Sequence, residues 1–165
     1  MSKAFPWLRV TQLTLGWLPV AIAFNAVGLS WGRVQGKSMQ PTLNRDNATT
    51  TKGDTVLLDK FSVQMLHRLV RGDVVVLKSP TDPGELLTKR LIALEGDWVE
   101  GRNGKRVVVP PGKCWVEGDN EDVSEDSNEF GSVPMALIEA RVVAILWPPS
   151  HVAKIPNALP PNRVL

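Results

Sequence analysis

Three segments of the chain carry side chains that together could break an amide bond. The first, QGKSMQPTLN, runs over residues 35–44 and contains Ser38. A serine hydroxyl is a poor nucleophile until a base removes its proton, and the usual base is a histidine held by an acid. Neither His67 nor His151 has a supporting motif around it. If Ser38 is a nucleophile, the sequence must therefore supply another base.

The second segment, LLTKRLIAL over residues 86–94, offers a lysine for that task. A lysine accepts a proton only when its amine is neutral, so its pKa must fall by about three units from roughly 10.4, a bias on the order of 4 kcal/mol. If the segment is a strand, Arg90 points away from Lys89. Lys89 then shares a face with three apolar side chains, those of Leu87, Leu91 and Ala93. Burial there could lower the pKa of Lys89, but an edge-strand lysine with a solvated ammonium group fits the pattern as well.

The third segment, GDNEDVSEDSNEFG over residues 118–131, is acidic. It fails as a calcium-binding loop, because no glycine stands at the sixth position of a loop that begins at Asp119 or Asp122. A solvated acidic turn is the simpler interpretation. Ser124 and Ser127 could instead orient a polar group.

The composition excludes several other kinds of site. The chain has 165 residues, of which 43% are hydrophobic and 22% charged, so it can form a packed core. Its net charge of +2 is too small to indicate nucleic-acid binding. Because Cys114 is the only cysteine, neither an intramolecular disulfide nor a zinc site built on several cysteines is possible.

A long uncharged stretch precedes the first of the three segments. Its centre, residues 13–31, has 19 residues, and a membrane-spanning helix needs about 20. We therefore expect an N-terminal segment over 1–12 and a transmembrane anchor over 13–31. A cleaved signal peptide is the main alternative, because Lys3 and Arg9 form a basic start. A buried core helix is the third.

After residue 32, short apolar runs alternate with turn residues, which predicts strands. These runs lie within residues 54–61, 72–80, 85–97, 97–109 and 140–149. Asn103-Gly104 between two apolar runs indicates a hairpin. We expect a mostly antiparallel β domain over 32–150 and an irregular, Pro-rich tail over 151–165.

Taken together, SMQPTL, RGDVVVLKSP with KRLIALEGD, and GDNEDVSEDSNEFG resemble the ordered motifs of type I signal peptidases. The resemblance covers about 32–147. It implies the family's mostly β fold of coiled antiparallel sheets, preceded by one transmembrane helix. It also implies a membrane-anchored serine endopeptidase with Ser38 as nucleophile and Lys89 as general base, acting through an acyl-enzyme without a cofactor or metal.

The same resemblance assigns supporting residues. Ser124 would hydrogen-bond the lysine amine, and Asp126 would support the site. Asn128 stands where the family usually has an arginine, so it could hydrogen-bond to Asp126, but a salt bridge to that carboxylate would be unavailable. Gly36 lacks the hydroxyl that assists the oxyanion hole in some members. The residues expected beside the substrate are Gly36, Met39 and Pro41.

The short chain, Asn128 and the ILWPP ending resemble the mitochondrial inner-membrane branch of that family. This implies precursor polypeptides with bipartite sorting signals as substrates, and a catalytic domain in the intermembrane space. It also implies a hetero-oligomer with subunit 1 of the inner membrane peptidase. The alternatives are a bacterial-type signal peptidase, a self-cleaving repressor-type Ser-Lys protease, and a non-catalytic anchored β module that stabilises a partner peptidase.

Overall fold

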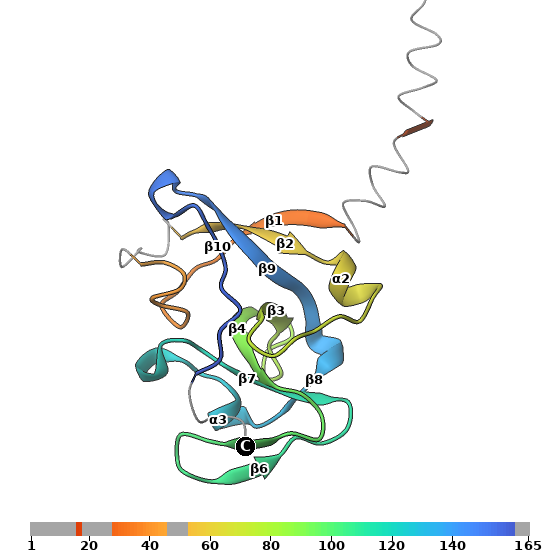
Figure 1. The fold of residues 1–165 in the computed structure, drawn as a ribbon, viewed down its shortest axis with the longest axis vertical. Helices are drawn as coiled ribbons and strands as arrows, with labels where there is room; N and C mark the ends of the chain where they lie inside the picture. Colours follow the sequence, from red (N-terminus) through yellow and green to blue (C-terminus); the bar gives the residue numbers. More distant parts are fainter. Residues whose placement is uncertain (1–15, 18–27, 46–52, 161–165) are drawn as a thin grey trace, which may run out of the picture.

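The computed structural model describes residues 16–17, 28–45 and 53–160. Within these ranges the chain is mostly β, and every paired strand is antiparallel to its neighbour. Figure 1 shows one large curled sheet with a separate hairpin beside it. The predicted mostly β, antiparallel fold class is confirmed.

The large sheet has eight strands in the order β1-β2-β9-β3-β4-β7-β8, with β10 paired to β9. Its strands are β1 Leu29–Arg33, β2 Thr55–Asp59, β3 Val74–Lys78, β4 Leu86–Ala93, β7 Lys113–Glu117, β8 Val133–Pro134, β9 Ile138–Trp147 and β10 Ala153–Lys154. The separate hairpin pairs β5 Trp98–Glu100 with β6 Arg106–Val108. Two α-helices of a single turn each, α2 Phe61–Gln64 and α3 Ser127–Phe130, lie within residues 53–160.

The long strand β9 connects the two halves of the sheet. Residues 138–141 pair with β3, and residues 141–147 pair with β2. Both ladders contain register shifts, and such bulges bend a strand and increase its twist. Figure 1 shows β9 running from the β1–β2 half to the β3–β4 half. Because of this connection, the loop after β1 and the strand β4 belong to one folded unit.

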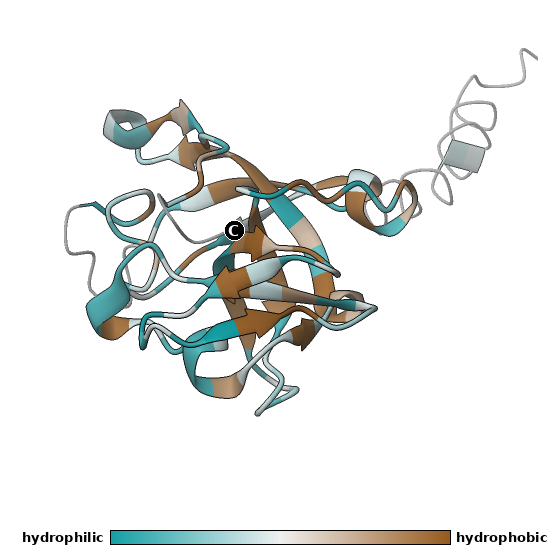
Figure 2. Ribbon diagram, turned by 60° about the horizontal axis from the view of Figure 1, so that its bottom comes forward, coloured by the Kyte–Doolittle hydropathy of each residue, from teal (hydrophilic) through white to brown (hydrophobic). Residues whose placement is uncertain are grey.

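Apolar side chains fill three clusters around this sheet, and Figure 2 shows that much of the ribbon of the strands is coloured as hydrophobic. The second cluster includes Leu91, with Leu87 packed against it, as expected for the face that carries Lys89. Ala93 does not belong to this cluster. A register shift between Leu91 and Ala93 interrupts the alternation of β4, and Ala93 packs in the third cluster with Ile92.

The structure differs from the sequence-based expectation at both ends. β1 begins at Leu29, so the last three residues of the predicted anchor range 13–31 lie in a strand. Most of that range lies outside the described residues, and the described part of the chain contains no helix long and apolar enough to cross a membrane. The tail predicted to be irregular contributes β10. The sequence also fails to predict β7, because charged residues stand at both ends of KCWVE.

The burial of two leucines on neighbouring strands predicts different contributions to stability. Leu77 in β3 is fully buried, whereas Leu86 in β4 is 56% exposed. Leu77→Ala is expected to lower the free energy of unfolding by about 2–5 kcal/mol, because it leaves a cavity in the second cluster. The matched change Leu86→Ala should cost less than about 0.5 kcal/mol. Urea unfolding followed by tryptophan fluorescence measures both, and equal losses would contradict this placement.

Candidate active site

The loop that carries Ser38 leaves β1 and is fastened to the start of β2. Val34 N donates to Asp54 O at 2.9 Å. Asn44 Nδ2 donates to Gly36 O at 2.8 Å, and Asn44 Oδ1 accepts a hydrogen bond from Asp54 N at 2.7 Å. Asn44 has a φ of 56°, a conformation in which asparagine is several-fold enriched. These contacts close the loop and fix the backbone on both sides of Ser38.

Two apolar residues anchor the same loop in the first core cluster. Met39 is 2% exposed and Leu43 is fully buried, and Leu43 N donates to Met39 O at 2.9 Å. Met39 and the exposed Pro41 lie outside the lining of the cleft that contains Ser38, whereas Gly36 lines it. Of the three residues expected beside the substrate, the structure thus places only Gly36 on the cleft.

Ser38 packs against the acidic segment through the backbone. Its carbonyl oxygen accepts a hydrogen bond from Asn120 N at 3.0 Å. A Cβ atom at Gly118 would collide with Ser38 O and with Ser124 Oγ. Glycine at this position therefore allows the nucleophile loop and the acidic segment to approach each other closely.

Lys89 lies in the middle of β4 and is only 3% exposed. Its Nζ donates to Ser124 Oγ at 2.9 Å. Burial lowers the pKa of Lys89 below its ordinary value, although the nearby carboxylates of Asp126 and Glu125 act in the opposite direction. Of the two interpretations that the apolar face left open, the buried lysine is confirmed and the solvated edge-strand lysine is excluded.

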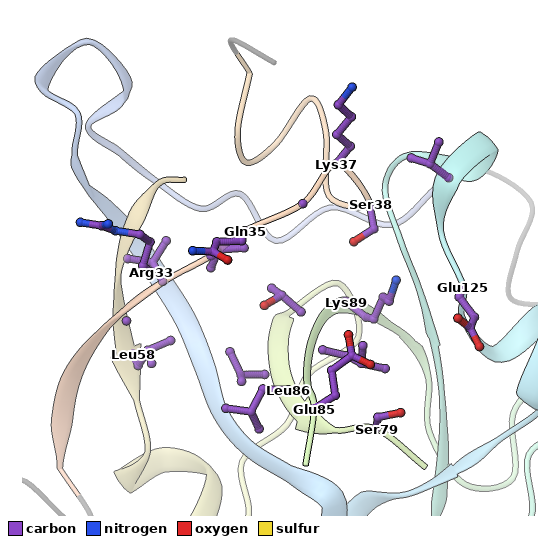
Figure 3. A pocket seen from close by; sticks show the side chains of 18 of the residues that line it. Arg33, Gln35, Lys37, Ser38, Leu58, Ser79, Glu85, Leu86, Lys89 and Glu125 are labelled. Carbon is purple, nitrogen blue, oxygen red and sulfur yellow. The ribbon is translucent and has the colours of Figure 1, made fainter. Parts of the chain in front are cut away.

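Ser38 and Lys89 line one cleft with a volume of about 600 Å³. Figure 3 shows the Ser38 hydroxyl and the Lys89 amine projecting into the same part of this cleft, while the side chain of Lys37 points away. Among the described residues no hydrogen bond joins Ser38 Oγ to Lys89 Nζ, since the amine donates to Ser124 instead. The cleft therefore contains a hydroxyl and a desolvated amine that face the same space.

Asp126 is fully buried directly behind Ser124. Its Oδ2 accepts hydrogen bonds from Ser124 Oγ at 2.7 Å and from Gly118 N at 2.9 Å. Its Oδ1 accepts two hydrogen bonds from Asn128, one from the backbone N at 3.1 Å and one from Nδ2 at 2.9 Å. Burial raises the pKa of Asp126, but these hydrogen bonds outweigh it and keep the pKa below its ordinary value.

The expectation that Asp126 has no salt bridge is wrong. Arg102, at the turn between β5 and β6, places a guanidinium nitrogen 2.8 Å from Asp126 Oδ2. Asn128 makes the expected hydrogen bonds to Asp126, and its Nδ2 also donates to Glu117 Oε1 at 2.9 Å. No sequence pattern points to Arg102, because the ion pair depends on where the hairpin packs.

The single cysteine and the two histidines, which are the other usual nucleophile and bases, are not part of this cleft. Cys114 is fully buried, and burial raises the pKa of its thiol to about 12. His151 Nδ1 lies 3.1 Å from Asp54 Oδ1, and neither histidine lines the cleft. The structure thus brings the predicted nucleophile, Ser38, and the predicted base, Lys89, into one cleft.

Comparison with known proteins gives consistent matches over most of the chain. The family described as signal peptidase, peptidase S26, matches residues 7–108 and 101–147. The Mus musculus mitochondrial inner membrane protease subunit 2 is 43% identical over 148 residues, which cover 88% of this chain and 83% of the mouse protein. The Saccharomyces cerevisiae subunit 2 is 39% identical over 153 residues, covering 91% of this chain and 85% of the yeast protein. A Schizosaccharomyces pombe subunit 1 is 40% identical over 119 residues, covering 70% and 72% of the two chains.

The burial of Cys114 predicts that this thiol is inert in the folded protein. Because its pKa is raised to about 12, the thiol stays protonated at neutral and mildly alkaline pH. Iodoacetamide at pH 8 should leave the native protein unlabelled and should label it fully in urea, as judged by intact mass. Since this is the only cysteine, rapid labelling of the native protein would contradict its placement.

Proposed function

Because this chain belongs to the signal peptidase family, peptidase S26, we propose that it is a serine endopeptidase in which Ser38 is the nucleophile and Lys89 the general base. The observation that carries this assignment is the environment of Lys89. Its amine is nearly inaccessible, and it donates a hydrogen bond to a neutral hydroxyl, that of Ser124. Burial without a directly bonded carboxylate favours the neutral amine, which is the form that accepts a proton.

The direction of the hydrogen bonds around Ser124 supports this role. Ser124 donates its own hydrogen to Asp126, so its oxygen is available to accept an N–H of Lys89. A neutral amine has two N–H groups and one lone pair. With one N–H held by Ser124, the lone pair can turn toward Ser38. We propose that Ser124 and Asp126 orient the base, and that Asn128 supports Asp126.

The proposed reaction follows from these positions. Lys89 takes the proton of Ser38 Oγ as this oxygen attacks the scissile carbonyl carbon. The resulting ammonium then protonates the leaving amine, and an ester to Ser38 remains. Lys89 next removes a proton from a water molecule that attacks the ester, and the proton returns to Ser38 Oγ as the acid product leaves. The distance between Ser38 and Lys89 must close in the substrate complex, as is common for catalytic hydrogen bonds that are loose in the free enzyme.

We propose that the developing oxyanion is stabilised by the Ser38 N–H group, since Gly36 offers no side-chain donor. Gly36 lines the cleft and is the residue we place beside the substrate. A glycine here lets an extended peptide approach the backbone closely. Met39 would act indirectly, by holding the loop in the core, and Pro41 would shape the turn after it.

The substrates we propose are precursor polypeptides with bipartite sorting signals, cut at the mitochondrial inner membrane. The names of the mouse and yeast relatives support this location. A single anchor that ends before β1, within residues 13–28, would hold the catalytic domain at the intermembrane-space side. Similarity to both subunits of the protease supports a hetero-oligomer with subunit 1.

Removal of either proposed catalytic group tests the assignment. Ser38→Ala is expected to abolish precursor cleavage, and Lys89→Ala should lower kcat/KM at least about 100-fold, because it removes the base. Lys89→Arg should fail as well, since a guanidinium does not lose its proton in a protein. The assay uses the full chain in detergent together with subunit 1, with subunit 1 inactivated at its own nucleophile.

Lys78→Ala is the matched control, because Lys78 lies on the neighbouring strand, is half exposed and pairs with Glu139. It should retain full activity. Cleavage at the wild-type rate by both Ser38→Ala and Lys89→Ala would contradict the assignment. The non-catalytic alternative, an anchored β module that stabilises subunit 1, predicts no cleavage even by the wild-type chain in this assay, because subunit 1 is inactivated.

The lowered pKa of Lys89 predicts the pH dependence of the reaction. Below this pKa the amine is protonated and cannot act as a base, so kcat/KM should fall about tenfold per pH unit on the acid side and reach a plateau above it. The midpoint is expected below 10.5, the ordinary value, because burial is the largest influence. A pH series of kcat/KM for wild type and Lys78→Ala measures it. A midpoint at or above 10.5 would exclude Lys89 as the base at physiological pH.

A further inference from the structure

We propose that Arg102, on the turn of the β5–β6 hairpin, is a positioning residue for the lysine base. Its ion pair holds the buried Asp126 carboxylate in the orientation that fixes Ser124 against Lys89. This inference rests on the proposed function, because it gives Arg102 a role only if Lys89 is the base.

The geometry forms an uninterrupted chain from the hairpin to the cleft. Arg102 Nη2 lies 2.8 Å from Asp126 Oδ2. The same carboxylate oxygen accepts a hydrogen bond from Ser124 Oγ at 2.7 Å, and Ser124 Oγ in turn accepts a hydrogen bond from Lys89 Nζ at 2.9 Å. Among the described residues, Arg102 is the cation found within salt-bridge distance of this fully buried carboxylate. Movement of the guanidinium would therefore change the position of the oxygen that orients Ser124.

The hairpin also forms hydrogen bonds to this site, and these bonds hold Arg102 in position. Arg102 N donates to Asn128 Oδ1 at 2.8 Å, and Asn128 Nδ2 donates to Asp126 Oδ1 at 2.9 Å. Gly101 is buried beside them, and its own N donates to Lys105 O at 2.9 Å across the turn. Both the backbone and the side chain of Arg102 are thus connected to the segment that carries Asp126.

The charge of Arg102 also acts on the base. The carboxylates of Asp126, Glu125 and Glu129 favour the charged form of Lys89 and raise its pKa. The positive charge of Arg102 lowers this pKa and adds to the larger effect of burial. Without Arg102, the buried carboxylate would lose its ion-pair partner, and its field would favour the ammonium form of Lys89. Arg102 therefore contributes to both the orientation and the neutrality of the base.

The test compares three variants of the full chain by the rate at which a peptidyl serine-directed probe acylates Ser38, measured from pH 5 to 10. Arg102→Gln keeps much of the side-chain volume but removes the charge. Arg102→Lys keeps the charge but has no guanidinium fork. The control is Arg106→Gln on the same hairpin, whose side chain is 63% exposed and pairs with Glu100.

Arg102→Gln is expected to raise the pKa of Lys89 and so to move the acid limb of the pH–rate profile to higher pH by about 0.5 to 1 pH unit. At a fixed pH on that limb, this shift lowers the acylation rate roughly 3- to 10-fold. Arg106→Gln should follow the wild-type profile. A purely structural role would lower the rate by one factor at every pH and leave the limb in place. An unshifted limb in a folded Arg102→Gln protein, as judged by its Tm, would overturn the inference.

Arg102→Lys decides the matter if Arg102→Gln does not fold. Because the charge remains, the acid limb should stay within about 0.3 units of wild type, while the plateau rate should fall at least about threefold because the fork is lost. Any other result for this variant contradicts the positioning role.

Failure of the proposed function would give a different labelling result from failure of this inference. Wild type would then not be labelled at Ser38, or Lys89→Ala would be labelled at the wild-type rate.

Discussion

The Asp126 carboxylate has no contact with solvent, yet its hydrogen bonds keep it in the charged form. An unpaired carboxylate in such a place would cost several kcal/mol, so its donors must come together when the chain folds. The donors are Ser124 Oγ, Gly118 N, Arg102 Nη2, Asn128 N and Asn128 Nδ2. They belong to the acidic segment and the β5–β6 hairpin. Satisfying one buried charge thus joins two parts of the chain at the edge of the cleft.

A buried carboxylate close to a lysine that must be neutral presents an electrostatic difficulty. Direct pairing would stabilise the ammonium form and raise the pKa of Lys89. The hydroxyl of Ser124 lies between the two groups, donating to Asp126 and accepting from Lys89. The amine is therefore oriented by a neutral partner, and part of the field of Asp126 is offset by Arg102. Burial then remains the largest influence on the pKa of Lys89.

Local sequence patterns were sufficient for the features set by neighbouring residues, but not for those set by tertiary contacts. Apolar runs between turn residues predicted strands. The apolar face around Lys89 left both a buried and a solvated lysine open, and the family resemblance favoured the buried one, because burial also depends on the strands that flank β4. Arg102 was missed because the residue it contacts is 24 positions away, and Asn103-Gly104 predicts a hairpin without saying where it packs. The anchor was extended to Trp31 because β1 continues the same apolar composition, although Trp31 is 77% exposed on a strand.

Titration of the Lys89 amine itself tests the central claim most directly. NMR of lysines labelled at Cε and Nζ, in the full chain in detergent, gives the pKa of each amine, and Lys89→Arg identifies the signal of interest. A pKa clearly below 10.5 is predicted, with the neutral amine populated in the pH range where the enzyme is active. A Lys89 amine that titrates at or above 10.5 would contradict its role as the base.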